Sequence, residues 1–589
     1  MSPFVCIPPG RYPYTTHLLK LQQFMPSATP ISALKASCAL QGGSSPLRPD
    51  AWVRLLTSHP DKAFGAYLTD GLTNGFRIGF NRCQPLTGVT KNMPSALRQH
   101  SVVADYIRKE VTLGRMIGPL PTNVVRFVHR NRIGVVPKGH TTGKWRLITD
   151  LSFPPGYSVN DGIDPALCSL SYVSIDSVAV VVASLGPGSL LAKIDIESAY
   201  RLVPVHPDDR PLLGIEWEGQ IYCDAMLPFG LRSSAKIFTA FADALEWIVR
   251  QKGVPHIEHY LDDFVVVGAP HSSQCADSLR TLTLTCQELG VPLATEKCEG
   301  PTSCLTFLGI ELDTIAWSMR LPADKLSRIK ATLFEWGDKK VCRRRELESL
   351  VGLLHHACKV VKPGRSFLRR MLNLLSGPFA SRGHHLVRLN RDFRADLSWW
   401  VTFISEWNGV ALMLRPTDEH LHFSSDAAGS WGCGASWNLH WFQVQWDTQS
   451  LPLSITIKEM LPVILAAAIW GEQWRGKQAI CYCDNQAVVA VLSSRTSREA
   501  NLMHMLRCLF YIEAFHDFSL RCVHVPGVTN RAADALSRNA LPSFFMQVPG
   551  ADPYPQPIPS RLISALLCKD GDWLSPTWRE QFDSTIPRA

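Results

Sequence analysis

The chain has 589 residues, 46% of them hydrophobic, which is enough for three or four domains with buried cores. Its formal net charge of +9 favours an anionic partner. Seventeen cysteines without an even framework, and the lack of a secretory signal, indicate an intracellular setting, cytoplasmic or nuclear, rather than secretion. The longest apolar stretches are interrupted or too short to span a bilayer, so we expect no membrane insertion.

The first hundred residues give the least information about their role. Residues 41–46 are rich in glycine, serine and proline, which is typical of a loop. Residues 76–80 suggest a short strand. Residues 101–116 are predicted to form an amphipathic helix, with Val103 and Ile107 on its apolar side.

A pair of adjacent acids stands between two predicted strands in the centre of the chain. Residues 191–200 alternate as a strand that carries Asp195. Residues 256–268 contain two β-prone runs on either side of Asp262 and Asp263, which predicts a hairpin with both carboxylates at its turn. Adjacent acids repel each other, and a divalent ion such as Mg²⁺ is the usual compensation. A solvated turn is the alternative interpretation.

Other predicted elements flank these two strands. Residues 144–150 form a strand, and residues 227–235 are a Pro/Gly loop that opens a helix over 236–250. Residues 307–310 are predicted to form a further strand after Lys297.

In this order the segments resemble the palm of reverse transcriptases. The resemblance implies that acids on a strand and a hairpin hold two Mg²⁺ ions, or Mn²⁺, against the phosphates of the incoming nucleotide. The implied ligands are Asp195, Asp262 and Asp263, with the backbone carbonyl of Ile196 as a further one. Two such ions clamp the attacking and leaving oxygens of an in-line displacement.

The resemblance extends to four residues that contact the nucleotide. Arg146 corresponds to the arginine that grips the triphosphate, and a guanidinium fork suits phosphate geometry. Tyr200 corresponds to the aromatic residue that rejects a 2′-hydroxyl, and Phe229 lies where the family's loop contacts the nucleotide. Lys297 falls where the family has a lysine proposed to protonate pyrophosphate. Alternatively, Tyr200 is a core residue, and Arg146 and Lys297 are ordinary surface charges.

The helical, basic segment from 322 to 416 resembles the thumb and connection of the same enzymes. Phosphate contacts with a template–primer duplex would explain its charge, and a solvated helix face or a nuclear-import-like run is the alternative. We expect Trp399, Trp400 and Trp407 to pack at the junction with the next domain. The basic residues are Arg343, Arg344, Arg345, Lys359, Lys362, Arg365, Arg369, Arg370, Arg382, Arg388, Arg391 and Arg394.

A second series of acids lies in the C-terminal third, each at a strand end or near a helix start. The series is Asp426 in a strand over 421–429, Glu459 in the first turn of an apolar helix, Asp484 at the end of a buried strand, and Asp534 in a helix that Asn530 could cap.

This order of acids resembles ribonuclease H. The resemblance implies that Asp426, Glu459, Asp484 and Asp534 bind two Mg²⁺ ions and activate water against an RNA phosphodiester. Alternatively, these acids do not bind metal, and Glu459 or Asp534 simply interacts favourably with a helix dipole. His524 lies near a loop that carries a mobile histidine in some relatives, and its role is left open. Cys481 and Cys483 share a strand face, but no second ligand pair follows at zinc spacing.

The predicted fold class is α+β and multidomain, with polymerase fingers, palm and thumb followed by a connection and a ribonuclease H-like α/β domain. A Pro-rich stretch from 553 to 559 is expected to be poorly ordered. The predicted domains are an N-terminal region of unknown role (1–100), fingers and palm (101–321), thumb and connection (322–416), ribonuclease H (419–540) and a C-terminal tail (541–589).

We therefore expect a retrotransposon enzyme, with the DIRS type as one candidate subfamily. It would be an RNA-directed DNA polymerase, a nucleotidyltransferase, and also an endonuclease that degrades the RNA of the hybrid. Its expected partners are an RNA template, a DNA primer, an RNA–DNA hybrid and deoxynucleoside triphosphates, and its oligomeric state is left open. The alternative is a catalytically inactive retroelement relic that only binds nucleic acid.

Overall fold

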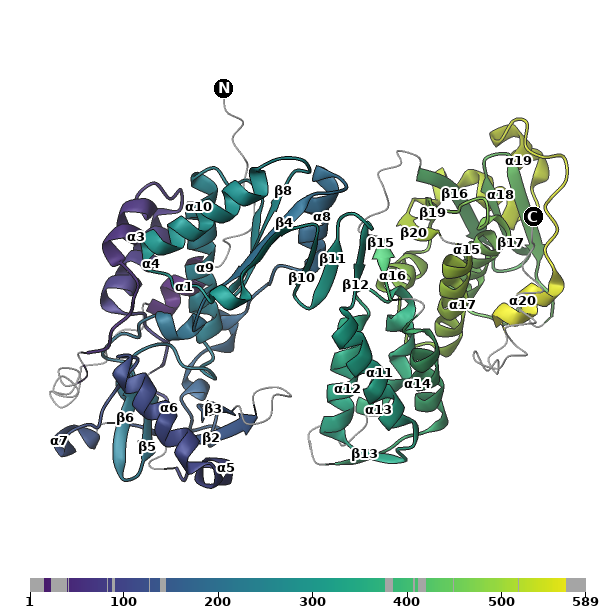
Figure 1. Cartoon of the computed structure of the whole chain (residues 1–589). Coiled ribbons are helices and arrows are strands. Elements are labelled where there is room, and N and C mark those ends of the chain that lie inside the picture. Colours follow the sequence, from purple (N-terminus) through teal and green to yellow (C-terminus); the bar gives the residue numbers. More distant parts are fainter. Residues whose placement is uncertain are drawn as a thin grey trace. The chain divides into compact units, whose positions relative to one another are not determined.

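The structure is a computed structural model whose described residues form two compact units, 1–308 and 309–589 (Figure 1). In the described part of the chain, no helix is long and apolar enough to cross a membrane. The described residues are 15–22, 40, 42–81, 83–86, 90–126, 128–137, 145–376, 385–405, 408–411, 420–448, 450–516 and 518–567.

The first unit is built on an antiparallel central sheet with the strand order β7-β8-β4-β9. Two long helices, α9 (Ser234–Gln251) and α10 (Gln274–Leu289), pack against it. Five of the six residues of β8 are buried, which explains its run of apolar residues. The strands are β7 (Ile257–Tyr260), β8 (Asp263–Gly268), β4 (Leu190–Asp195) and β9 (Glu299–Thr302).

A second sheet in this unit has the order β1-β6-β5-β2-β3. The predicted amphipathic helix is α6 (His100–Thr112), and Val103 and Ile107 are buried against this sheet. The helix ends before residue 116, because Met116 already begins β1. The strands are β1 (Met116–Ile117), β6 (Gln220–Asp224), β5 (Gly214–Trp217), β2 (Arg130–Pro137) and β3 (Trp145–Asp150).

The first hundred residues share the core of the central sheet. Trp52 packs on Phe241 of α9 with ring centroids 4.7 Å apart, and its Nε1 donates to the carbonyl of Leu289 at 3.1 Å. The strand predicted over 76–80 is wrong, because only Phe76 and Phe80 make isolated bridges. The remaining helices of the unit are α1 (Thr15–Gln22), α3 (Pro49–Leu56), α4 (Lys62–Asn74), α5 (Pro94–Arg98), α7 (Thr122–Val125) and α8 (Ile175–Leu185).

The predicted strand over 307–310 is also wrong, since these residues form a turn. Phe307 ends β10 (Cys304–Phe307), and Ile310 begins β11 (Ile310–Asp313). Between them Leu308 and Gly309 have φ values of 48° and 71°. Positive φ at both positions is the geometry of a two-residue hairpin turn, which suits glycine but which leucine does not signal.

In the second unit, the described part of the segment predicted to be helical from residue 322 contains four α-helices, interrupted by short strands. Leu347, Leu350, Val351 and Leu354 are buried on one side of α12. Strand β12 pairs with β11 and β15, and β13 pairs with β14. The elements are β12 (Ser318–Arg320), α11 (Ala323–Gly337), β13 (Val341–Arg343), α12 (Arg344–Ala357), α13 (Arg369–Leu375), β14 (Leu386–Arg388), α14 (Arg391–Phe403) and β15 (Val410–Ala411).

The tryptophans predicted for the domain junction lie on α14. Trp399 stacks on Phe367 with ring centroids 4.0 Å apart. The guanidinium of Arg507, on helix α17 of the following domain, lies 5.3 Å from the same phenyl ring. Trp399 therefore packs next to the junction, Trp400 is buried beside it, and Trp407 lies outside the described residues.

The C-terminal domain is an α/β fold around a sheet with the order β18-β17-β16-β19-β20. Strands β16, β19 and β20 are parallel, and β17 and β18 are antiparallel to their neighbours. The predicted fold class, α+β with a C-terminal α/β domain, is confirmed. The elements are β16 (His420–Ala427), β17 (Gly432–Trp437), β18 (His440–Gln445), α15 (Ile455–Trp470), β19 (Gln478–Cys483), α16 (Gln486–Ser494), α17 (Ala500–His516), β20 (Ser519–His524), α18 (Arg531–Ser537), α19 (Leu541–Gln547) and α20 (Ser560–Leu567).

The Pro-rich stretch after 541 is packed on this domain rather than poorly ordered. The backbone N–H groups of Asp552 and Gln556 both donate at 2.9 Å to carbonyls of the β18 hairpin, those of Leu439 and Trp441. Helix α20 buries two leucines beside α17. The expectation of disorder is therefore wrong for residues 553–559, because composition does not show which backbone donors find partners.

A buried ion-pair group ties the segment after β4 to its surroundings. Arg201 lies in the short helix η3 (Ala199–Leu202), which follows the strand that carries Asp195. Its guanidinium lies 2.8 Å from a carboxylate oxygen of Glu110 on α6 and 2.7 Å from one of Asp224 on β6. All three side chains are buried, so each charge depends on the others.

We predict that Arg201→Met destabilises the first unit by about 3–5 kcal/mol, because it leaves the buried Asp224 without a cation and Glu110 with Arg115 alone, 3.8 Å away. Urea unfolding followed by tryptophan fluorescence measures this loss. A triple variant that also carries Glu110→Gln and Asp224→Asn should recover part of it. A loss below about 1 kcal/mol would mean that the group does not hold η3 in place.

Candidate active sites

Three carboxylates meet at one end of the central sheet. Asp195, the last residue of β4, lies directly opposite Asp263, the first residue of β8. Asp262 occupies the turn between β7 and β8 together with Leu261, whose φ is 54°. The backbone N–H of Ile196 donates to the carbonyl of Asp262 at 3.0 Å. The prediction that both hairpin acids lie in the turn is therefore correct for Asp262 only.

A lysine supplies positive charge to this cluster. The Nζ of Lys297 lies 2.9 and 3.0 Å from the two carboxylate oxygens of Asp195, so it donates to both. This bond raises the pKa of Lys297 above its ordinary value. Lys297 ends the short helix η5 (Thr295–Lys297), which the bond from the N–H of Ala294 to the carbonyl of Asp195 holds beside β4.

The other two acids of the cluster are harder to ionise. Burial, followed by the charges of Asp262 and Asp195, raises the pKa of Asp263 to about 6. Burial and the charge of Asp195 also raise the pKa of Asp262. Three half-buried or buried carboxylates at one strand end can all be charged only beside a cation. Their all-oxygen donor set fits Mg²⁺, a hard ion that prefers carboxylates.

Next to this cluster lie the aromatic and basic residues predicted to contact a nucleotide. The ring centroid of Tyr200 lies 5.2 Å from that of Phe229 and 5.4 Å from that of Phe238. The guanidinium carbon of Arg146 lies 5.8 Å from the Phe229 ring centroid. Phe229 is 41% exposed, so the pair presents an accessible aromatic surface between a cation and Asp262.

The burial of Tyr200 bears on the alternative that it is a core residue. Burial raises its pKa to about 12, with smaller contributions from Tyr172, Asp262 and Tyr260. The ring is only half-buried, and one contact is with the exposed Phe229. Tyr200 is thus at the edge of the core, facing the acid cluster.

The four acids of the second series also converge. Asp426 lies near the end of β16, and Asp484 directly follows β19, the parallel strand beside it. Glu459 lies in the second turn of α15 rather than the first, because Ser454 caps that helix before Ile455. Asp534 lies on α18, which packs against β16.

Polar contacts from α18 position this cluster. Ser537 Oγ donates to Asp426 Oδ2 at 2.5 Å, and Arg538 Nε donates to Asp534 Oδ1 at 2.6 Å. Asn530 occupies the N-cap position of α18 as predicted, but its side chain makes no capping hydrogen bond. Its side-chain amide instead donates to the carbonyl of Ser425 at 2.9 Å and so ties the start of α18 to β16.

Glu459 is the least satisfied member of the second cluster. Its side chain is buried, 5% exposed, and Oε2 has no hydrogen-bond partner. Burial, together with the charges of Asp426, Cys483 and Asp484, raises its pKa to about 10. Burial and the charges of Asp484 and Asp534 raise the pKa of Asp426 to about 6, although Ser537 opposes this shift. A buried carboxylate that has one oxygen without a hydrogen-bond partner and lies among other acids fits a divalent cation.

Sequence reasoning missed two parts of this site. Ser537 lies three residues after Asp534, and nothing in its spacing indicates a bond to Asp426. Cys483 lies against Glu459 and Asp484, although its sequence neighbours show no ligand pair. His524, whose role was left open, lies at the rim, with Nε2 3.1 Å from the backbone carbonyl of Asp484.

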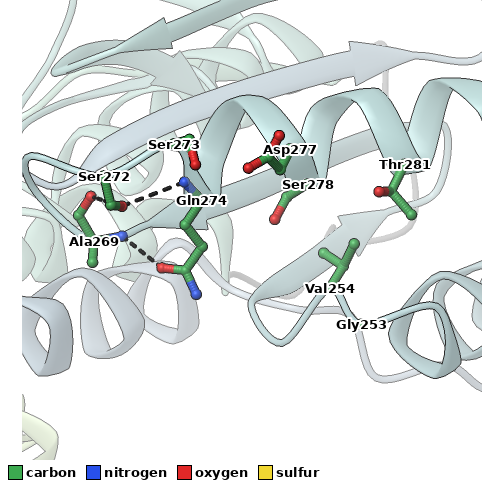
Figure 2. Close-up of a pocket in the computed structure, with 9 residues that line it drawn as sticks. All are labelled: Gly253, Val254, Ala269, Ser272, Ser273, Gln274, Asp277, Ser278 and Thr281. Carbon is green, nitrogen blue, oxygen red and sulfur yellow. Dashed lines mark hydrogen bonds between the residues drawn. The ribbon is translucent and has the colours of Figure 1, made fainter.

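An open pocket of about 460 Å³ lies elsewhere in the first unit (Figure 2). Its polar wall is the start of α10, where the side chain of Gln274 accepts from the N–H of Ala269 at 2.8 Å. None of the predicted site residues lines it. The two acid clusters, rather than this pocket, are the candidate active sites.

Residues 136–312 match the family described as reverse transcriptase (RNA-dependent DNA polymerase). The Pro-Pol polyprotein of Feline foamy virus is 24% identical over 224 residues, 38% of this chain and 17% of the polyprotein. Polyprotein P3 of Commelina yellow mottle virus is 22% identical over 400 residues, 65% of this chain and 20% of that protein. The transposon Tf2-3 polyprotein of Schizosaccharomyces pombe is 21% identical over 379 residues, 61% of this chain and 26% of the polyprotein. The chain thus spans about a quarter or less of these relatives.

Solved structures similar to this chain include the foamy viral protease-reverse transcriptase. Its complex with dsDNA is 17% identical, with a TM-score of 0.45, and the match covers 81% of this chain and 97% of that chain. Its complex with an RNA/DNA hybrid is 15% identical, with a TM-score of 0.44, covering 80% of this chain and 62% of that chain. TM-scores this low support no further conclusion about this chain.

We predict that the raised pKa of Glu459 makes the free energy of unfolding depend on pH. Because the folded-state pKa lies above the ordinary value of 4.5, the protonated acid stabilises the fold at low pH, and this contribution is lost as the pH rises toward about 10. In chelator, the wild type should therefore lose stability relative to Glu459→Gln by up to about 1.4 kcal/mol per pH unit.

Thermal unfolding of both proteins between about pH 5 and 9 measures the difference, because this range lies between the ordinary pKa of 4.5 and the raised pKa of about 10. Glu472→Gln, an exposed glutamate outside the cluster, is the control. A difference between wild type and Glu459→Gln that does not change with pH would contradict the prediction.

Proposed function

We propose that this chain, which carries a reverse transcriptase domain of the retroelement type over residues 136–312, is an RNA-directed DNA polymerase that also degrades the RNA of RNA–DNA hybrids. The observation that carries the polymerase proposal is the meeting of Asp195, Asp262 and Asp263 at one strand end. The ribonuclease proposal rests on the second cluster, Asp426, Glu459, Asp484 and Asp534. Each unit thus has its own acid cluster, one for each proposed activity.

For DNA synthesis, the proposed ligands of two Mg²⁺ ions are the three aspartates and the carbonyl of Ile196. Bound there, the ions would supply charge neutralisation at the attacking hydroxyl and the leaving phosphate. Arg146 binds phosphate oxygens of the triphosphate, because its exposed guanidinium lies over the ring of Phe229. Tyr200, which packs against Phe229, rejects a 2′-hydroxyl on the sugar, and the exposed Phe229 lies against the nucleotide. Lys297 donates a proton to the departing pyrophosphate.

For hydrolysis of RNA, the proposed metal ligands are Asp426, Glu459, Asp484 and Asp534. Bound Mg²⁺ would supply an activated water at neutral pH. Ser537 keeps Asp426 oriented, because its hydroxyl donates to Oδ2 and leaves the other oxygen free to bind. The unpartnered Oε2 of Glu459 is a ready ligand. The backbone of the site is held by parallel strands, so the acids need little rearrangement.

The proposed polymeric partners are an RNA template, a DNA primer and their hybrid. The basic segment supports this in part, because some of its arginines are paired within the segment and others are exposed, while Arg382 lies outside the described residues. Arg344, Arg370 and Arg394 are engaged within the segment by acids or backbone carbonyls. Exposed guanidinium groups are the ones available for phosphates. These exposed residues are Arg343, Arg345, Arg365, Arg388 and Arg391.

The relic that only binds nucleic acid is the second candidate. A protein without turnover needs no acid cluster, whereas this chain keeps all seven acids at two meeting points. One of them, Glu459, is buried with an unpartnered oxygen, and its charged form costs free energy that a bound cation would offset.

We predict that the two activities separate in single variants. Asp262→Asn should lower DNA synthesis on an RNA template at least about 100-fold, because it removes charge from the proposed metal site, and should leave hybrid cleavage intact. Asp484→Asn should do the reverse. Primer extension and cleavage of a labelled hybrid, both in Mg²⁺, measure the two activities. Loss of both in either folded variant would contradict two sites, and their absence from the wild type would favour the relic.

We also predict that Mg²⁺ stabilises the folded chain. At about 100 times its dissociation constant, the ion should add about 2.7 kcal/mol for each independent site. Differential scanning calorimetry with and without Mg²⁺ measures the rise in unfolding temperature. Asp263→Asn and Glu459→Gln should each reduce it. An unchanged rise in the double variant would place the bound ions outside both clusters.

A further inference from the structure

The acid cluster of the C-terminal domain contains a thiol. The Sγ of Cys483, a carboxylate oxygen of Glu459 and a carboxylate oxygen of Asp484 all lie within 4.8 Å of one another. Cys483 is completely buried, so its thiol is shielded from solvent, and its sulfur accepts from the backbone N–H of Asn485 at 3.4 Å. In the part of the chain that the structure describes, this is the one group of three such donors that converges so closely.

Glu459 distinguishes this group from an incidental gathering of acids. Its side chain is 5% exposed, and Oε2 is buried without a hydrogen-bond partner. Leaving such an oxygen unpaired costs free energy, which a ligand cation would recover. The donors lie on α15 and at the end of β19, two elements that pack in one rigid domain. Closing the donors onto an ion needs a shift of about 1 Å, given bond lengths of about 2.0–2.3 Å.

The mixture of sulfur and oxygen atoms changes which ion the group prefers. Mg²⁺ takes oxygen ligands and gains nothing from a thiolate. Zn²⁺ and similar ions bind thiolates and carboxylates tetrahedrally, and three protein ligands leave the fourth position for water. Cys483 also has a sulfur neighbour, because its thiol donates a hydrogen bond to the sulfur of Cys522 on β20. The thiol therefore has a sulfur atom on one side and carboxylates on the other.

We propose that Glu459, Cys483 and Asp484 form a binding site for a thiophilic divalent cation of the Zn²⁺ class. Binding forms a metal–sulfur bond and releases the thiol proton to solvent, with no change of oxidation state. Because two of the ligands belong to the proposed Mg²⁺ site, the thiophilic ion displaces Mg²⁺ and stops hybrid cleavage. This inhibition rests on the proposed ribonuclease function, whereas the binding does not.

Cadmium is the probe for the binding, because a thiolate bound to Cd²⁺ has an ultraviolet charge-transfer band. The reduced, chelator-treated full chain is titrated with Cd²⁺, and the band is followed by difference absorbance. Cys483→Ala should weaken Cd²⁺ binding at this site at least about 10-fold and remove one thiolate from the band. Cys508→Ala is the matched control, because Cys508 is equally buried but lies on α17 beside His504.

Two further measurements decide which atoms hold the ion. Asp484→Asn should also weaken the band, and excess Mg²⁺ should compete with Cd²⁺ in the wild type. An unchanged band in folded Cys483→Ala would overturn the proposal. So would a band that Cys522→Ala removes and Asp484→Asn leaves unchanged, since the ion would then lie among thiols only. Should Cys483→Ala fail to fold, Asp484→Asn and the Mg²⁺ competition give the same decision.

The inhibition is tested separately by cleavage of a labelled hybrid in Mg²⁺ with added Zn²⁺. Each protein is compared with its own rate without Zn²⁺, and the wild type should need at least about 10-fold less Zn²⁺ for half inhibition than Cys483→Ala. Equal sensitivity would overturn the inhibitory role. A wild type that binds Cd²⁺ through Cys483 but cleaves no hybrid would contradict the proposed ribonuclease and leave the cation site standing.

Discussion

Repulsion between carboxylates held close together at strand ends is the constraint on which both candidate sites depend. In the first unit, backbone pairing fixes Asp195 opposite Asp263, so these acids cannot separate without breaking the sheet. In the C-terminal domain, the parallel pairing of β16 and β19 brings Asp426 and Asp484 toward the same edge. Burial is the largest cause of the raised pKa values of Asp263, Asp426 and Glu459, and repulsion from neighbouring acids adds to it. Such an arrangement gains free energy only when a cation or a proton joins it.

The two clusters solve this problem differently. In the first, Lys297 bridges both oxygens of Asp195, so a positive charge from the chain itself is already present. In the second, Arg538 pairs with Asp534 at the exposed end, and no such cation reaches Glu459 in the described structure. An ion bound in the first cluster must therefore displace Lys297 from Asp195 or share the carboxylate with it. An ion bound in the second cluster meets the unpartnered oxygen of Glu459. The second cluster is the more sensitive to the identity of the ion, since it also holds a thiol.

Much of this arrangement could be predicted from sequence, because the signals were local. Alternation identified β4, β16 and β19, and the two β-prone runs around Asp262 identified the hairpin. The errors were errors of backbone conformation. Leu261 and Leu308 adopt positive φ in two-residue turns, a conformation that leucine does not signal, so Asp263 was placed in a turn and residues 307–310 in a strand. Contacts across the fold were also missed, because no spacing connects Ser537 with Asp426 or Cys483 with Glu459.

The packing of residues 551–556 on the β18 hairpin has a consequence for the edge of the C-terminal sheet. Strand β18 is the outermost strand, and an uncovered outermost strand offers free N–H and C=O groups to other molecules. Gln556 occupies the Trp441 carbonyl of this strand and Asp552 occupies the Leu439 carbonyl just before it, while the intervening prolines have no N–H with which to extend the pairing. A chain cut after residue 540 would keep every acid of the second cluster, yet it would expose a surface prone to intermolecular strand pairing and aggregation.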